Sequence, residues 1–214
     1  MVRYLASVQL ISLTPSAEQQ ILYCARVSSD QENESPKLLK YMIDHKHWSP
    51  FEMAHAVFEI NTSRAIAAQI LRHRSFSFQE FSQRYAEPEG FEMYPGRRQA
   101  KTNRQSSIDD LSEEDQDWFL RAQNEITERA SAFYEYAIKE RGIAKESARF
   151  LLPLSVKTKL YMSGTLRSWI HYVELRCQED VQLEHREIAI IIRDFLSANL
   201  PYISEAMGWD NEPV

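Results

Sequence analysis

The residues best suited to chemistry gather in one stretch, residues 72–85, which reads RHRSFSFQEFSQRY. It holds three arginines, a histidine, four aromatic residues and three serines within fourteen positions. Arginine grips phosphate through paired hydrogen bonds and keeps its charge at every physiological pH. Serine hydroxyls add neutral donors, and aromatic rings offer flat surfaces for a planar ligand. The stretch therefore favours a nucleotide site; the alternative is a basic segment paired with carboxylates, its aromatic residues in the core.

Composition narrows the class of protein. The length of 214 residues fits one domain over 1–214, and the net charge of −6 disfavours general nucleic-acid binding, which needs a broad cationic surface. Cys24 and Cys177 are too few for a cysteine zinc site, so we expect no metal. Without a secretion signal they indicate reduced thiols in a cytoplasmic protein. No apolar run is long enough to cross a bilayer, so we expect no membrane partner.

The five glycines form neither the glycine-rich turn of a dinucleotide-binding unit nor a phosphate loop. A nucleotide would therefore be held mainly by side chains, which again points to the arginines. Ser82 lies between Arg74 and Arg84 but has no base partner in the sequence, so we interpret it as a donor to a ligand rather than a nucleophile.

Helices and strands predicted from the sequence must position this stretch. Together they indicate an α+β fold in one domain. Apolar patterning predicts strands over 2–12 and 53–62, a loop at 28–34 and a connection over 154–163. Residues 86–111 carry the cationic run Arg97, Arg98, Lys101 and Arg104 and predict a flexible loop, or a lid over an anion. Helices are predicted from Pro15 to about Arg26, from Pro36, over 63–73, after Ser112, over 145–152, near 165–176 and over about 182–199.

The helix after Ser112 has the clearest signal. Ser112 and Asp115 resemble a capping box, and Gly142 marks its end. At about 28 residues it would be about 42 Å long, which is long for a compact domain. Part of its face is therefore expected to pack on another subunit. The helix over 182–199 is also unusually apolar, which indicates burial by a partner or at the centre of the fold.

Three arginines outside the central stretch are further candidates. Arg167 and His171 are four residues apart and share a helix face. Arg176 is nine residues beyond Arg167, so it faces a different direction, into another copy of the site or toward nearby glutamates. Arg149 lies in the apolar segment SARFLLP, where it either meets an anion or extends its charge outward.

The ordered motifs resemble those of the flavin-dependent thymidylate synthases from near the start of the chain to about residue 200. Arg-His-Arg, seven residues, then Ser-x-Arg is the signature of that family. HxSPFE and Gln69 come before this signature, and ARxxLP at 148–153 and Arg167 with His171 and Arg176 come after it, all in the family's order. The resemblance implies an α+β fold with a mixed sheet and long helices, in a homotetramer whose subunits share active sites.

The resemblance also implies an activity, namely reductive methylation of dUMP to dTMP in dTMP biosynthesis. Methylenetetrahydrofolate would supply the carbon, FAD reduced by NADPH would supply the hydride, and no enzyme side chain would bond to dUMP. His47 matches a position on the folate or flavin side, and Arg176 would stabilise charge on the uracil ring. The implied FAD contacts are Ser49, Arg72, His73, Arg74, Ser75, Gln79, Glu80, Thr165, Arg167 and His171. The implied dUMP contacts are Gln69, Glu80, Phe81, Ser82, Gln83, Arg84, Arg149 and Arg176.

Three positions depart from the family pattern. Thr165 stands where many members have Asn, Asp180 where His is frequent, and Gln79 where some have Asn. Two other classes of function also fit the arginines. A nucleotide- or RNA-binding module would use the same side chains without flavin. In a helical scaffold, Arg72→Ala and Arg84→Ala would change assembly rather than ligand binding.

Overall fold

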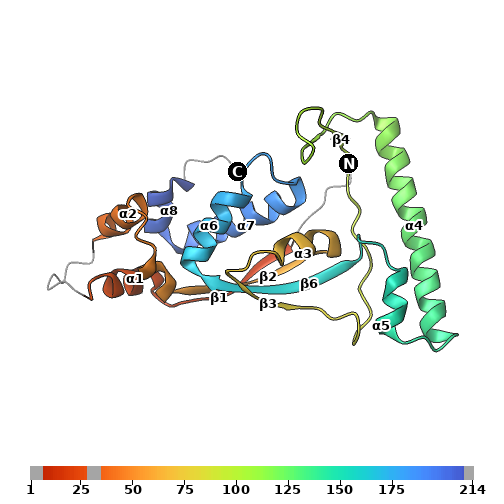
Figure 1. Cartoon of the computed structure of the whole chain (residues 1–214), viewed down its shortest axis with the longest axis horizontal. Helices are drawn as coiled ribbons and strands as arrows, with labels where there is room; N and C mark the ends of the chain where they lie inside the picture. Colours follow the sequence, from red (N-terminus) through yellow and green to blue (C-terminus); the bar gives the residue numbers. More distant parts are fainter. Residues whose placement is uncertain (1–6, 28–34, 210–214) are drawn as a thin grey trace.

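The computed structural model of the chain describes residues 7–27 and 35–209. Its centre is a four-stranded sheet in the order β1-β2-β6-β3 (Figure 1). The strands are β1 (Ser7–Leu13), β2 (His55–Ser63), β3 (Ser77–Glu80) and β6 (Lys157–Thr165). All three pairings are antiparallel, so the expected mixed sheet is wrong. The predicted loop 28–34 and the first part of the predicted strand, residues 2–6, lie outside the described residues.

Helices α3, α6 and α7 lie over one face of this sheet (Figure 1). Helices α1, α2 and α8 gather at one end of it, and α4 stands at the opposite end with α5 beside it. The helices are α1 (Ala17–Ala25), α2 (Pro36–Asp44), α3 (Arg64–Ile70), α4 (Glu113–Lys139), α5 (Lys145–Ala148), α6 (Leu166–Arg176), α7 (Leu183–Asn199) and α8 (Pro201–Met207). Short 3-10 helices cover Ser49–Met53 (η1) and Arg149–Leu151 (η2), and β4 (Arg98–Gln99) pairs with β5 (Ser107–Ile108).

Several predicted elements are confirmed at their caps. The Ser35 side chain accepts from the N–H of Lys37 at the start of α2, and Ser112 accepts from Asp115 at the start of α4. Gly142, just beyond α4, has φ +65°, a conformation that glycine adopts without strain. Helix α1 begins two residues after Pro15, because Ser16 in the left-handed region is its N-cap.

Strand β6 corrects the prediction that 154–163 is a connection. Its residues alternate, with Thr158, Leu160, Met162 and Gly164 buried and the Lys157, Lys159 and Tyr161 side chains exposed. This two-residue period was present in the sequence as KTKLYMSGT, where lysines and a serine mask the strand signal. β6 pairs with both β2 and β3, so it is an inner strand that joins β3 to the rest of the sheet.

The core lies between the sheet and the helices above it. Phe58 on β2 and Trp169 on α6 are fully buried, with ring centroids 4.9 Å apart, and the Trp169 Nε1–H donates to the Ala56 carbonyl at 3.1 Å. Ile188 and Ile192 of α7 are also fully buried. The apolar character of α7 therefore reflects burial within this chain, the second of the two alternatives that its sequence left open.

A glycine fixes the central stretch against this core. A Cβ at Gly164 would lie 2.5 Å from Cδ1 of Phe76, so the Phe76 ring occupies the space that any other residue would need. The Phe76 ring also packs on Trp169 at 4.6 Å between centroids. The aromatic residue at position 76 is thus an anchor that holds the turn before β3 against the sheet.

No described helix is long and apolar enough to cross a membrane.

Candidate functional site

The Arg-His-Arg motif forms the turn between α3 and β3. The N–H of Arg72 donates to Gln69 O at 3.3 Å and that of His73 to Ile70 O at 3.1 Å, which closes the end of α3. Ser168 Oγ of α6 donates to the Ser75 carbonyl at 3.3 Å and ties the turn to α6. Arg72 and Arg74 are exposed, and within the described part of the chain neither has a carboxylate partner. Both guanidinium groups are therefore available to an anion.

His73 differs from the two arginines because its ring turns inward. It lies against Tyr172, with ring centroids 4.9 Å apart, and its Nε2 accepts the Nε–H of Arg176 at 2.9 Å. Burial, followed by the charges of Arg176 and His171, lowers the pKa of His73 to about 4. His73 is therefore neutral at pH 7 and holds Arg176 beside the motif.

Helix α6 carries two of the residues that the resemblance assigns to flavin, Arg167 and His171. Arg167 pairs with Glu52 of η1 next to the exposed Ser49, and His171 is exposed farther along α6. Arg167 and Arg176 thus meet different partners, as their helical phase predicted. Thr165 is the N-cap of α6 and accepts from the Ser168 N–H at 3.2 Å, a task that Asn performs equally well. His47 is exposed, and its ring lies 5.9 Å from that of Tyr41.

A cavity of about 290 Å³ lies beside α3. Of the residues implied for dUMP, it brings together Glu80, Gln83 and Arg149. Glu80 is fixed by Arg64 at 2.5 Å and by the Thr158 hydroxyl at 2.9 Å. Arg64 also lines the cavity, and the sequence analysis missed it. The only signal for it was a basic residue at the start of a predicted helix.

Gln83 supplies a buried amide donor at this cavity. Its side chain is only 4% exposed, yet its Nε2 has no hydrogen-bond partner among residues 7–27 and 35–209. A buried donor without a partner costs about 1–3 kcal/mol, so an acceptor from a ligand would relieve it. The Arg149 Nε–H donates to the Glu146 carbonyl at 3.1 Å, and its guanidinium lies 5.5 Å over the Phe150 ring. The cavity thus brings together two cations, Arg64 paired with Glu80 and Arg149 without a described carboxylate partner, and the amide of Gln83.

The remaining residues implied for dUMP do not line this cavity. Arg84 pairs with Glu146 at 3.0 Å, and Ser82 Oγ accepts from the Arg84 N–H at 3.4 Å. The Phe81 N–H donates to Lys159 O at 2.8 Å, which continues the β3–β6 pairing. Gln79, which the resemblance assigns to FAD, is exposed on β3. Gln69 lies at the end of α3, where its backbone carbonyl accepts from the Arg72 N–H, and Arg176 contacts His73 of the Arg-His-Arg motif.

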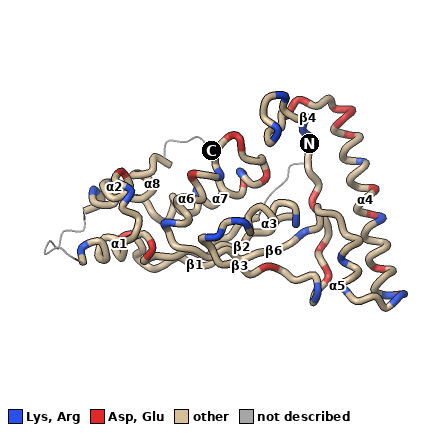
Figure 2. Tube along the Cα trace, viewed as in Figure 1, with Lys and Arg blue, Asp and Glu red and all other residues tan. Residues whose placement is uncertain are grey.

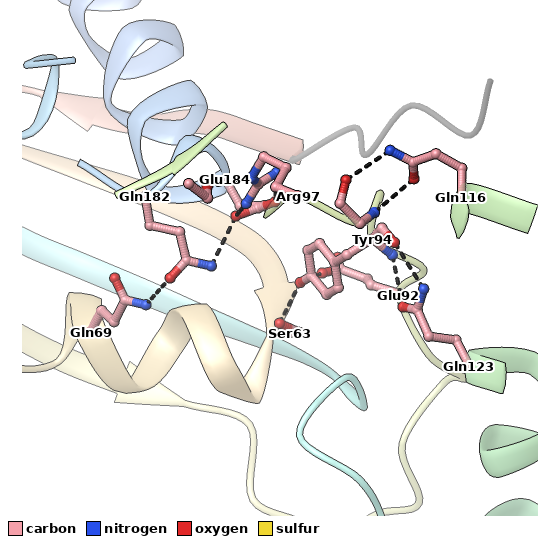
Figure 3. A network of polar contacts seen from close by, with 11 residues as sticks. Ser63, Gln69, Glu92, Tyr94, Arg97, Gln116, Gln123, Gln182 and Glu184 are labelled. Atoms are coloured by element: carbon pink, nitrogen blue, oxygen red, sulfur yellow. Dashed lines mark hydrogen bonds and ion pairs between the residues drawn. The ribbon is translucent and has the colours of Figure 1, made fainter. Parts of the chain in front are cut away.

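A polar network next to α3 was not foreseen from the sequence (Figure 3). The Gln69 Nε2 donates to Gln182 Oε1 at 2.6 Å, and Gln182 Nε2 donates to Glu184 Oε2 at 2.9 Å. Arg97 donates to the same Glu184 oxygen at 2.8 Å. Gln69 and Gln182 are 113 residues apart, so no local spacing could reveal the pair.

Part of the predicted lid over 86–111 is held firmly. Gln123 of α4 makes hydrogen bonds to both the N–H and the carbonyl of Tyr94, and Gln116 does the same for Gly96 (Figure 3). The larger cavity beside this segment, about 760 Å³, contains none of the residues implied for FAD or dUMP. Movement of the segment as a lid stays a prediction.

The buried imidazole of His185 makes the free energy of unfolding depend on pH. It is fully buried, its Nε2 lies 3.1 Å from the Tyr172 hydroxyl, and burial, then the charges of Arg176 and His73, lower its pKa to about 3. Below pH 6.5 the unfolded chain takes up a proton that the native state excludes. The stabilisation present above pH 6.5 is therefore lost as the pH falls toward 3, at up to about 1.4 kcal/mol per pH unit.

We expect His185→Gln to flatten this acid limb. The measurement is the free energy of unfolding from urea titrations at pH 7, 6 and 5. His55→Gln, which removes an exposed imidazole on β2, is the matched control. An unchanged slope in His185→Gln would contradict the assignment of a neutral buried imidazole.

The chain matches known proteins over nearly its whole length. A profile of the family described as thymidylate synthase complementing protein matches residues 9–202. A flavin-dependent thymidylate synthase of Synechocystis sp. is 51% identical over 196 residues, covering 91% of each chain. A protein of Paramecium bursaria Chlorella virus 1, called a probable flavin-dependent thymidylate synthase, is 46% identical over 95% of this chain and 99% of its own.

A solved structure also resembles the fold of this chain. The UMP/dUMP methylase PolB from Streptomyces cacaoi, bound with 5-Br UMP, superposes with a TM-score of 0.86 at 25% identity. The match covers 96% of this chain and 95% of that one. A second structure of the same protein, bound with 5-Br dUMP, gives the same TM-score.

Proposed function

This chain belongs to the family of thymidylate synthase complementing proteins, and from that premise we propose that it is a flavin-dependent thymidylate synthase that methylates dUMP to dTMP. The observation that carries the proposal is the cavity of about 290 Å³ beside α3. There a cation, Arg149, faces a nucleotide-sized space together with the unpartnered amide of Gln83. A phosphate and a pyrimidine carbonyl are the groups that these two side chains would bind.

FAD fits a set of side chains along α6, the adjacent η1 and the turn before β3, which we call the α6 strip. Arg72 and Arg74 are exposed without carboxylate partners in the described chain, as the phosphates of a dinucleotide require. Arg167 and His171 lie on α6, and Ser49 lies on the adjacent η1. When bound, FAD would supply the hydride that reduces the transferred carbon. In this proposal the arginines bind its phosphates and the side chains along α6 orient its ring.

The other reactants follow from the family. Methylenetetrahydrofolate would donate the carbon near His47, and NADPH would be the reductant. We place no enzyme nucleophile at the pyrimidine. Cys24 and Cys177 are absent from the lining of the cavity, and the Ser82 hydroxyl contacts the Arg84 N–H rather than a base.

Arg176 would act electrostatically. Neutral His73 holds its Nε, so the terminal nitrogens of the guanidinium remain to stabilise charge that develops on the uracil ring. Because His73 carries no charge at pH 7, it orients Arg176 without adding a second cation. This arrangement supports an electrostatic role for Arg176 and a positioning role for His73.

A homotetramer is part of the proposal, and α4 supports it. One side of this helix exposes Trp118, Ile126, Phe133 and Tyr136, with Trp118 63% and Phe133 63% exposed. Large apolar side chains gathered on one helix are typical of a surface that packs on another subunit. Sharing between subunits would also bring the α6 strip of one chain to the cavity of another.

The test is a visible absorption spectrum of the purified protein after FAD is added and the excess is removed on a desalting column. We expect flavin absorption to stay with the protein and to shift on addition of dUMP, because both ligands would occupy one site. A protein that neither retains FAD nor responds to dUMP would contradict the proposal and favour a nucleotide- or RNA-binding module.

A further inference from the structure

Helix α4 has two apolar sides, and the rest of the described chain covers only one of them. The covered side is formed by the buried residues Ala130, Tyr134 and Ala137. The other side exposes four large side chains: Trp118 63%, Ile126 58%, Phe133 63% and Tyr136 54%. At about 100° per residue these four lie within about 80° of one another around the helix axis. We call them the α4 outer face, a continuous apolar surface of the kind that marks an interaction site.

Charged residues beside the outer face follow a self-complementary order. Figure 2 shows acidic and basic residues interspersed along α4. Asp117, Arg121, Glu135 and Lys139 are all exposed along one border of the outer face. Asp117 and Lys139 are each eleven residues from Glu128, and Arg121 and Glu135 are each seven residues from it. If a second α4 ran in the opposite direction and crossed at Glu128, Asp117 would therefore meet Lys139, and Arg121 would meet Glu135.

The same order disfavours parallel pairing. Two parallel copies in register would place Arg121 beside Arg121 and Glu135 beside Glu135, and like charges flanking an apolar helix contact destabilise it. A surface that is complementary to itself when reversed forms a closed contact with two-fold symmetry. The charges therefore favour a second, antiparallel copy of this chain as the occupant of the outer face.

A shallow groove of about 570 Å³ runs along the C-terminal half of α4. Its wall includes three carboxylates, one ammonium group and one aromatic ring: Glu128, Glu135, Glu140, Lys139 and Tyr136. In the antiparallel register, Trp118 and Arg121 of the second copy lie opposite residues 138 and 135, which places them over this groove. An indole ring and a guanidinium group suit a wall that is acidic and partly aromatic.

We propose that the α4 outer face packs antiparallel on the same face of a second copy, with the two helices crossing at Glu128. Trp118 and Arg121 of each copy would then enter the groove of the other. The inference rests on the homotetramer of the proposed function, and it names the helix, the direction and the register of one of its contacts. The helix has 27 residues and is about 40 Å long, so the contact would extend along most of its length.

The experiment exchanges charges across the contact and measures the dissociation constant of the assembly by sedimentation velocity, on full-length protein with FAD present. Arg121→Glu places like charges at residues 121 and 135, twice in each two-fold contact. We expect the dissociation constant to rise at least about tenfold at low salt, and less at high salt, because salt screens exposed charges. Glu135→Arg should have the same effect. Circular dichroism checks that α4 stays helical in both variants.

The double variant, Arg121→Glu with Glu135→Arg, restores two opposite-charge pairs with their signs exchanged. It should return the dissociation constant to within about threefold of the wild type, which general damage to the helix would not do. Glu128→Gln tests the crossing point. Each Glu128 carboxylate would lie beside its counterpart there, so removal of the charge should tighten the assembly about twofold or more.

Arg104→Glu is the matched control, the same charge reversal at an exposed residue outside α4, and should leave the assembly unchanged. An unchanged dissociation constant in Arg121→Glu, or a double variant as weak as the single ones, would overturn the inference. Weaker assembly in Glu128→Gln would overturn the register. A wild type that assembles and responds as expected, but neither retains FAD nor responds to dUMP, would overturn the proposed function alone, so the two failures are distinguishable.

Discussion

Replacing Arg176 by alanine should lower the turnover of dUMP by about 10²–10³-fold while the protein stays folded. The guanidinium is the cation that His73 holds beside the motif, and no ion pair with a described carboxylate competes for it. Removing it would leave the charge that develops on the uracil ring without its stabilising partner. Single-turnover formation of dTMP, followed with saturating substrates, separates this effect from weaker binding.

Two comparisons make the Arg176 result specific. Arg129→Ala removes an exposed arginine that pairs with Glu125 on α4, and should leave turnover unchanged. The pKa of His73 should rise in Arg176→Ala, since the charge of Arg176 is the second cause of its lowering after burial. NMR titration of His73 would check this. Turnover within a few-fold of the wild type would contradict the role given to Arg176.

The second large effect is expected at Arg149. Arg149→Ala should raise the Kd for dUMP by about 10²-fold, because a charged partner of the phosphate is lost from a partly buried cavity. FAD retention should be unaffected, since the residues proposed for FAD lie along α6 and in the turn at 72–75. Equilibrium dialysis with dUMP, together with the flavin spectrum, measures both quantities on one sample.

The control for Arg149 is Arg141→Ala, an exposed arginine just beyond α4. It should change neither ligand, although it removes the same charge from the same region of the chain. Loss of FAD in Arg149→Ala with unchanged dUMP affinity would reverse the assignment of the two ligands. Equal loss of both would indicate a damaged fold rather than a missing contact.

Local chemistry in the sequence was enough to predict most of the helices. Ser35 and Ser112 cap α2 and α4, and the spacing of apolar residues located the long helix to within one residue of its length, about 28 expected and 27 found. These signals are local because a helix closes its hydrogen bonds within four residues. The same holds for Arg72 and Arg74, whose closeness in the sequence predicted a nucleotide site by composition alone.

Sheet pairing was where the sequence fell short. Strand β6 was missed although its residues alternate, since two lysines and a serine made it resemble a connection. A strand closes its hydrogen bonds with a partner elsewhere in the chain, so its signal is weaker and its direction is not encoded locally. For the same reason the antiparallel order β1-β2-β6-β3 was not predicted.

The sequence by itself determined which chemical groups the protein possesses: arginines for phosphate, aromatic surfaces, and amides in a known order of motifs. Only the tertiary structure decided which of them meet. It placed Arg176 on His73 across 103 residues and Gln69 on Gln182 across 113. It also buried His73 enough to keep it neutral, and it left the side-chain NH₂ of Gln83 without a partner among the described residues. Burial and long-range contact arise only when the chain is packed, because they depend on neighbours that linear spacing cannot identify.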